Sequence, residues 1–185
     1  MRALVVYESM FGNTHTIARH IAEGIDTAGE SNVVSVHHAT PELVAAADLV
    51  VVGGPTHVHG MSSGRSRDGA AEQADEDDDL ELDPDALGDG LREWFDRLGD
   101  DAGSGRLAAA FDTRVHASPL LTGQASKGIA KRLRKDAFEL LVDGESFFVD
   151  KSNHLEPDEA GRAVAWGRSV AELAQAARSG GSLKR

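Results

Sequence analysis

The feature that most constrains the fold lies near the start of the chain, where an apolar run is followed by a polar turn and then by a helical pattern. The apolar run is residues 3–6, and isoleucines then recur at positions 17, 21 and 25 with the spacing of one helix face. The turn between them, residues 7–16, carries hydroxyl and glycine residues but no lysine or arginine. Because a helix start leaves backbone N–H groups unpaired and concentrates partial positive charge, this turn predicts a nest for an anion such as phosphate.

The rest of the chain alternates in the same way between short apolar strands and helical patterns. After the first strand at 3–7, we predict strands over residues 32–36, 48–54, 107–111 and 139–149, the last around a turn at 143–144. We predict helices over about 14–28, from Pro41 with Thr40 as N-cap, around 91–98, over 123–135 with Thr122 as cap, and over 158–177. This alternation predicts an α/β fold with one parallel sheet and right-handed crossovers.

Composition limits the possible classes of function. The 185 residues suit one domain, and the absence of cysteine excludes disulfides, iron–sulfur clusters and cysteine-bound zinc. The formal net charge is −12, and residues 65–89 supply −9 of it through 11 acidic and 2 basic side chains, so we expect no nucleic-acid partner. The early first strand leaves no room for a signal peptide, and no apolar run reaches the roughly 20 residues of a membrane span. We therefore expect a cytoplasmic protein without a membrane partner.

Residues 63–89 interrupt the pattern with a polar, acidic stretch of low complexity. It has no apolar periodicity, so we predict a flexible insertion that folding does not need and whose charge could steer a partner. The predicted domain is then 1–178 with this insertion, followed by a disordered tail at 179–185. The helix over 123–135 is rich in lysine and arginine, which predicts a solvated face or, alternatively, a docking patch for an acidic partner.

The turn sequence Ser9-x-Phe11-Gly12-Asn13-Thr14 resembles the phosphate loop of the flavodoxin family. The resemblance continues with Gly-Gly-Pro-Thr at 53–56, Phe-Asp-Thr at 111–113 and Ala-Trp-Gly at 165–167, and it covers nearly the whole chain. It implies a flavodoxin-like three-layer sandwich with a five-stranded parallel sheet of order 2-1-3-4-5. It also implies that FMN binds across the carboxyl ends of the first, third and fourth strands.

The resemblance assigns the contacts with FMN to three loops. The phosphate is assigned to Ser9, Met10, Phe11, Gly12, Asn13 and Thr14. One side of the flavin ring is assigned to Pro55, Thr56, His57, Val58, His59 and Gly60, and the other side to Asp112, Thr113, Arg114 and His116. Flavodoxins typically place a tryptophan or tyrosine in the two ring loops, where this chain has histidines instead. We expect these histidines to raise the flavin's reduction potential on acidification, since an unperturbed histidine titrates near 6.5.

These features predict an FMN-binding electron-transfer protein, a function that requires no catalytic side chain because the flavin performs the redox step. Its partner would be a redox protein or a small-molecule electron donor or acceptor. The alternatives are a small FMN-dependent reductase acting on NAD(P)H or a quinone, and a flavin-free domain of the same fold that only binds a partner. His57 and His59 are spaced like a metal pair, but no acidic ligand follows them in the turn, so we predict no metal.

Overall fold

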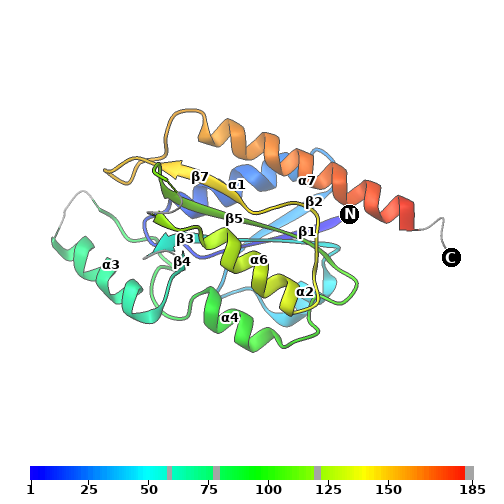
Figure 1. Ribbon diagram of the computed structural model, residues 1–185, viewed down its shortest axis with the longest axis horizontal. Coiled ribbons are helices and arrows are strands. Elements are labelled where there is room, and N and C mark those ends of the chain that lie inside the picture. Colours follow the sequence, from blue (N-terminus) through cyan, green and yellow to red (C-terminus); the bar gives the residue numbers. More distant parts are fainter. Residues whose placement is uncertain (58–59, 77–79, 119–121, 182–185) are drawn as a thin grey trace.

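The computed structural model describes residues 1–57, 60–76, 80–118 and 122–181, and it has a central sheet between two layers of helices (Figure 1). The strands are β1 (Arg2–Tyr7), β2 (Glu30–Ser35), β3 (Leu49–His57), β4 (Gly60–Met61), β5 (Leu107–Val115), β6 (Glu139–Leu140) and β7 (Glu145–Val149). The helices are α1 (Asn13–Ile25), α2 (Pro41–Ala46), α3 (Gly64–Glu76), α4 (Leu91–Leu98), α6 (Ala125–Lys135) and α7 (Glu159–Gly181).

The sheet runs in the order β2-β1-β3-β5-β6, and these strands are all parallel. β7 also pairs in parallel with β5, so β6 and β7 lie along different parts of the same neighbour. The main path of the sheet follows the predicted order 2-1-3-4-5, but the described sheet has seven strands rather than the predicted five, because the predicted fifth strand is divided into β6 and β7 and β4 is added. The sheet is not wholly parallel, however, because the short strand β4 pairs antiparallel with the end of β3.

β3 continues to His57, although Pro55 was predicted to end it. β1 pairs with β3 only as far as Gly53, so β1 forms no backbone hydrogen bonds with β3 at Pro55. A proline is tolerated at this position because it lacks the N–H that such a bond would require. On the other side Pro55 stays in register with Thr113 of β5. The carboxyl ends of β1, β3 and β5 therefore finish beside one another.

Each face of the sheet is covered by its own helices (Figure 1). On one face, Ile17 of α1 and Val170 of α7 belong to a single buried cluster with the strands. On the other face, Trp94 of α4 and Ile129 of α6 belong to a second cluster, together with α2. All four positions belong to apolar residues that recur at helical spacing in the sequence. Leu173 follows the same spacing in α7, but it is exposed.

The acidic segment 63–89 is more ordered than its composition predicts. Gly64–Glu76 forms α3, which lies beyond the carboxyl ends of the strands on the side of β4 (Figure 1). Arg67 and Asp83 are buried, whereas the sequence predicts a flexible insertion here. Among the described side chains, the buried residues of α3 are Arg67 and Ala70, and these two do not form an apolar stripe that periodicity could detect. Residues 77–79 lie outside the described residues.

Several helix boundaries differ from the predicted ones. α7 runs to Gly181, so the predicted disordered tail begins inside a helix, and residues 182–185 lie outside the described part. Gln124, not Thr122, occupies the N-cap of α6. Thr40 caps α2 as predicted, since its hydroxyl accepts a hydrogen bond from the Leu43 N–H at 3.4 Å. Within the described residues, no helix has the length and apolar character needed to span a membrane.

Candidate cofactor site

The loop between β1 and α1 leaves the start of the helix open. Gly12 occupies the N-cap with a left-handed φ of 82°, which an L side chain rarely adopts, and its N–H donates to Ser9 Oγ at 3.1 Å. No side chain caps the helix, and its first turn contains no acidic residue. A Cβ on Gly12 would meet no atom within 4 Å, so the space beside the loop is free. An anion can therefore approach the unpaired N–H groups of the first turn.

A cavity of about 170 Å³ lies at the carboxyl ends of β1, β3 and β5, beside this loop. Its lining brings together Ser9, Met10, Phe11, Asn13, Thr14, Pro55, Thr56, His57, Thr113 and Arg114, all of which were predicted from the sequence. It also includes Val115, Val149 and Asn153, which were not predicted. Sites that enclose a drug-sized ligand measure roughly 300–1,000 Å³, so this cavity suits one end of such a ligand.

Other predicted site residues that the structure describes, among them Gly60 and Asp112, do not line this cavity. Gly60 faces a different groove, on the outer side of the β3–β4 hairpin. Val58 and His59 lie outside the described residues. Asp112 is fully buried but points to α6, where its Oδ2 accepts from the Ser126 N–H at 2.7 Å. A carboxylate at a helix start is stabilised by the helix dipole, which accounts for this position.

Polar contacts join the three segments that surround the cavity. The hydroxyls of Thr14 and Thr113 are 2.7 Å apart, which connects the first turn of α1 to the end of β5. Asn13 Nδ2 donates to the Asn153 carbonyl at 2.7 Å, which connects the same turn to the loop after β7. Asn153 has a left-handed φ of 59°, a conformation that asparagine tolerates. Because this contact joins residues 140 positions apart, no local motif in the sequence predicts that Asn153 lines the cavity.

Among the described residues, Arg114 is the one arginine in the cavity lining, and its side chain is nearly enclosed, with the residue 7% exposed. Its Nη1 donates to the Ala117 carbonyl at 2.7 Å and to Thr122 Oγ1 at 3.1 Å, and its guanidinium lies 4.8 Å from the centre of the Phe148 ring. Its buried Nε has no hydrogen-bond partner among the described residues. The cavity therefore contains a fixed positive charge with a free donor.

The two histidines that the structure describes in the ring loops differ in environment. Burial lowers the pKa of His57, while Glu8 raises it and Arg67 lowers it to smaller extents. His116 is exposed, stacks on Phe148 with ring centres 4.3 Å apart, and contacts Glu156 at 2.9 Å, so it does not line the cavity. Across the described residues, no group of three or more His, Asp or Glu side chains is placed to hold a metal ion.

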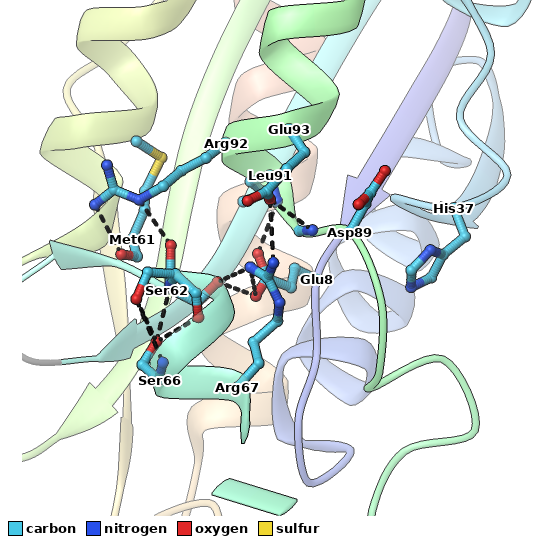
Figure 2. A network of polar contacts seen from close by, with 12 residues as sticks. Glu8, His37, Met61, Ser62, Ser66, Arg67, Asp89, Leu91, Arg92 and Glu93 are labelled. Carbon is cyan, nitrogen blue, oxygen red and sulfur yellow. Dashed lines mark hydrogen bonds and ion pairs between the residues drawn. The ribbon is translucent and has the colours of Figure 1, made fainter. Parts of the chain in front are cut away.

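A buried polar network connects the phosphate loop to the hairpin (Figure 2). Glu8, which directly precedes Ser9, is 3% exposed and accepts hydrogen bonds from the Ser62 hydroxyl and from the Leu91 N–H at 2.8 Å. Arg67 of α3 lies 3.9 Å from the same carboxylate and donates to Ser62 Oγ at 3.2 Å. The insertion thus supplies the cation that compensates a buried carboxylate beside the cavity.

Helix α4 completes this network. Arg92 donates through Nε to the Ser62 carbonyl at 2.7 Å and through Nη2 to the Met61 carbonyl at 3.0 Å (Figure 2). Glu93 accepts from Arg67 at 3.2 Å and from the Gly90 N–H at 2.9 Å. These contacts hold Met61 and Ser62, which follow Gly60, in place. The contacts were not predicted from the sequence, in which Arg67 lies inside the acidic segment and Arg92 just after it.

The insertion also contacts the outer side of the phosphate loop. The Asp83 N–H donates to the Met10 carbonyl at 2.7 Å, and its carboxylate lies 3.1 Å from His15 Nδ1. His15 in turn stacks on Tyr7, with ring centres 4.4 Å apart. Burial, followed by the charges of Asp83 and Asp85, raises the pKa of Tyr7 to about 12. The insertion thus contacts both the backbone of this loop and the first turn of α1.

Comparison with known proteins was made on both sequence and structure. A sequence model of the flavodoxin family matches residues 5–113, a range that contains the ends of β1 and β3 and most of β5. Comparison with curated protein sequences gives no match. Among solved structures, a flavodoxin from the domain Archaea has a TM-score of 0.65 at 19% identity, covering 95% of this chain and 99% of that one.

Two further solved structures show the same likeness in different settings. Oxidised flavodoxin 2 from Bacillus cereus has a TM-score of 0.65 at 21% identity, over 93% of this chain and 99% of that chain. The rubredoxin oxygen:oxidoreductase from Desulfovibrio gigas has a TM-score of 0.64 at 15% identity, and the match covers 95% of this chain but 36% of that one. At these identities the structural likeness shows the fold, which therefore occurs both alone and as part of a longer protein.

Proposed function

The chain belongs to the flavodoxin family, whose members bind FMN and transfer electrons, and on this premise we propose that its cavity at the ends of β1, β3 and β5 holds FMN. When bound, the flavin supplies the redox chemistry, and the chain supplies binding, orientation and electrostatics. The observation that carries the proposal is the uncapped start of α1, with Gly12 in a left-handed conformation and open space beside it.

The first loop offers only neutral donors to a phosphate. The N–H groups of Asn13 and Thr14 lie in the first helical turn, where no intrahelical acceptor exists. The buried hydroxyls of Ser9 and Thr14 lie beside them and line the cavity. Ser9 Oγ already accepts from Gly12, so its own hydrogen is free to point toward the anion. This set fits a terminal phosphate and thereby favours FMN over FAD.

The other end of the cavity would meet the flavin ring. His57 lies at the end of β3 and Arg114 at the end of the neighbouring strand β5. Because burial lowers the pKa of His57, this side chain stays neutral at pH values where an ordinary histidine is already partly protonated. Arg114 is charged at every working pH and has a free buried Nε–H. The positive charge that we first assigned to histidines is therefore better assigned to Arg114.

A reductase that passes electrons between NAD(P)H or a quinone and FMN is the second candidate function. It is favoured by the cavity lining, in which the described residues include neither tryptophan nor tyrosine. Steady-state oxidation of NAD(P)H by the FMN-loaded protein separates the two candidates. Rapid turnover with a quinone would identify a reductase, whereas slow oxidation is expected of an electron carrier.

The visible spectrum of the purified protein tests the proposal directly. Bound oxidised flavin should give its absorbance bands, and mass spectrometry of the released cofactor should identify FMN. Protein that is colourless and stays colourless after addition of FMN would contradict the proposal and would favour a flavin-free partner-binding domain. FAD as the sole released flavin would contradict the assignment of the first loop to a terminal phosphate.

A further inference from the structure

A second hollow lies on the outer side of the β3–β4 hairpin, between β4, α4 and α6. It measures about 620 Å³. Its lining consists of Gly60, Met61, Gln124 and Gly128 together with five cationic side chains, Arg92, Lys131, Arg132, Arg134 and Lys135. No acidic side chain lines it among the residues that the structure describes. We call this hollow the basic groove.

The charges of the basic groove are only partly neutralised. Arg132 pairs with Asp96 at 2.6 Å, and Lys135 pairs with Asp100 at 3.2 Å. Arg92 donates to backbone carbonyls and has no carboxylate partner in the described structure. Lys131 and Arg134 are exposed, and neither forms an ion pair with any described residue. Five cations against two carboxylates leave a local excess of three positive charges.

The hairpin places this excess charge next to the proposed FMN cavity. Thr56 and His57, at the end of β3, line the cavity, whereas Gly60 and Met61 of β4 line the basic groove. The same two-stranded hairpin therefore forms a wall of both hollows. A molecule that docks in the basic groove lies against the outer side of that wall.

The groove's charge is opposite in sign to that of the rest of the chain. The net charge of the chain is −12, and residues 65–89 supply −9 of this. An acidic partner is repelled by most of this protein and attracted by the basic groove, so long-range electrostatics would select one docking orientation. The acidic segment would favour the opposite kind of partner, because it would attract basic proteins.

We infer that the basic groove is the docking surface for an acidic protein that exchanges electrons with the cavity beside it. This inference rests on the proposed function, since it names the partner of the same site. It goes beyond that function because it fixes both the sign of the partner's charge and the face on which the partner sits.

The shape of the charged region favours a protein over a small anion. Lys127, Lys131 and Lys135 recur at helical spacing along α6, and eight residues of helix span about 12 Å. A single phosphate group needs donors that converge on one point, as in a bidentate arginine contact. The two arginines best placed for such a contact are already used: Arg92 donates through Nε and Nη2 to the Ser62 and Met61 carbonyls, and Arg132 pairs with Asp96. The lysines and Arg134 are spread along the helix and match an extended acidic surface.

The test uses the FMN-loaded full chain and poly-L-glutamate as an acidic polypeptide probe. In wild-type protein, we expect the probe to shift backbone amide resonances of α6 and β4 and to bind more weakly as salt concentration rises. The double variant Lys131→Glu/Arg134→Glu should bind the probe about tenfold more weakly, because two attractive contacts become repulsive. The neutral variant Lys131→Gln/Arg134→Gln should lie between these two.

A matched control has the same change of charge on the opposite helix layer. Arg19 of α1 and Arg168 of α7 are both exposed, so Arg19→Glu/Arg168→Glu lowers the net charge by the same amount.

Equal weakening of probe binding in this control, or unchanged binding in Lys131→Glu/Arg134→Glu, would overturn the inference. Shifts of the α6 and β4 resonances by inorganic pyrophosphate but not by poly-L-glutamate would overturn it in favour of a small-anion site. Absence of flavin from the purified protein would instead count against the proposed function, and the probe titration does not depend on flavin.

Discussion

The loop after β1 and the hairpin after β3 line the same cavity, but different kinds of contact hold them. The loop is built from neighbouring residues, with Gly12 donating to Ser9 and the turn leading directly into α1. The hairpin is held by residues far away in the sequence, since Arg67 of α3 and Arg92 of α4 bind Ser62 and its neighbours (Figure 2). The comparison teaches that a local motif can shape one side of the cavity, the proposed phosphate end, while the other side, the proposed ring end, depends on an insertion.

The largest effect should come from removing the cation of the buried network. Arg67→Met leaves the carboxylate of Glu8 buried without its compensating charge, which typically costs about 3–5 kcal/mol of unfolding free energy. Denaturant unfolding monitored by circular dichroism measures this loss.

Two further variants sharpen this test. Arg65→Met, at an exposed position of the same helix, should change the unfolding free energy by less than about 0.5 kcal/mol. Glu8→Gln combined with Arg67→Met should recover part of the lost stability, because a neutral amide requires no cation. If Arg67→Met proves as mild as Arg65→Met, the insertion does not support the hairpin.

The contrast between loop and hairpin also separates what the sequence predicted from what it did not. The alternation of strands and helices follows from local patterns, whereas the sheet order follows from the resemblance to flavodoxins. The structure has that order along β2-β1-β3-β5-β6, with extra strands beside it. Segment 63–89 was expected to be dispensable, but it supplies Arg67 to Glu8 and Asp83 to the Met10 carbonyl. These contacts join distant residues through charge and hydrogen bonds, which leave no periodicity in the sequence. The structure therefore predicts that deletion of residues 66–83 destabilises the protein.

The next effect concerns the loop and should be smaller. Thr14→Ala removes a hydroxyl beside the proposed phosphate position, and a hydrogen bond to a charged acceptor contributes roughly 1.5–3 kcal/mol. We expect FMN to bind more weakly by about that amount in a fluorescence titration. Riboflavin, which lacks the phosphate, is the matched control and should be affected much less. Equal weakening for both ligands would show that the first loop does not recognise phosphate.

A further prediction compares the two sides of the proposed ring site through the flavin's reduction potential. Arg114 supplies a buried positive charge on the β5 side, and Arg114→Met should make the potential more negative by several tens of millivolts, where about 59 mV corresponds to a tenfold change for one electron. His116→Gln should have little effect, because His116 is exposed and contacts Glu156. Potentiometric titration of both variants measures the difference, and a larger shift in His116→Gln would reverse the assignment.

The smallest effect concerns pH and His57. In the unfolded chain a histidine titrates near 6.5, and burial lowers the pKa of His57 in the folded protein. The unfolded state therefore binds more protons than the folded state as the pH falls below about 6.5, so acidification should cost stability until the folded pKa has been passed.

His57→Gln removes this contribution, and its unfolding free energy should fall less than that of the wild type between about pH 7 and pH 5. His20→Gln serves as a control outside the cavity and should leave the pH dependence close to that of the wild type. Denaturant midpoints of wild type and both variants, measured across this pH range, test the prediction. Identical pH profiles for wild type and His57→Gln would show that His57 titrates as it does in the unfolded chain, and the histidine side of the ring site would then be open to water.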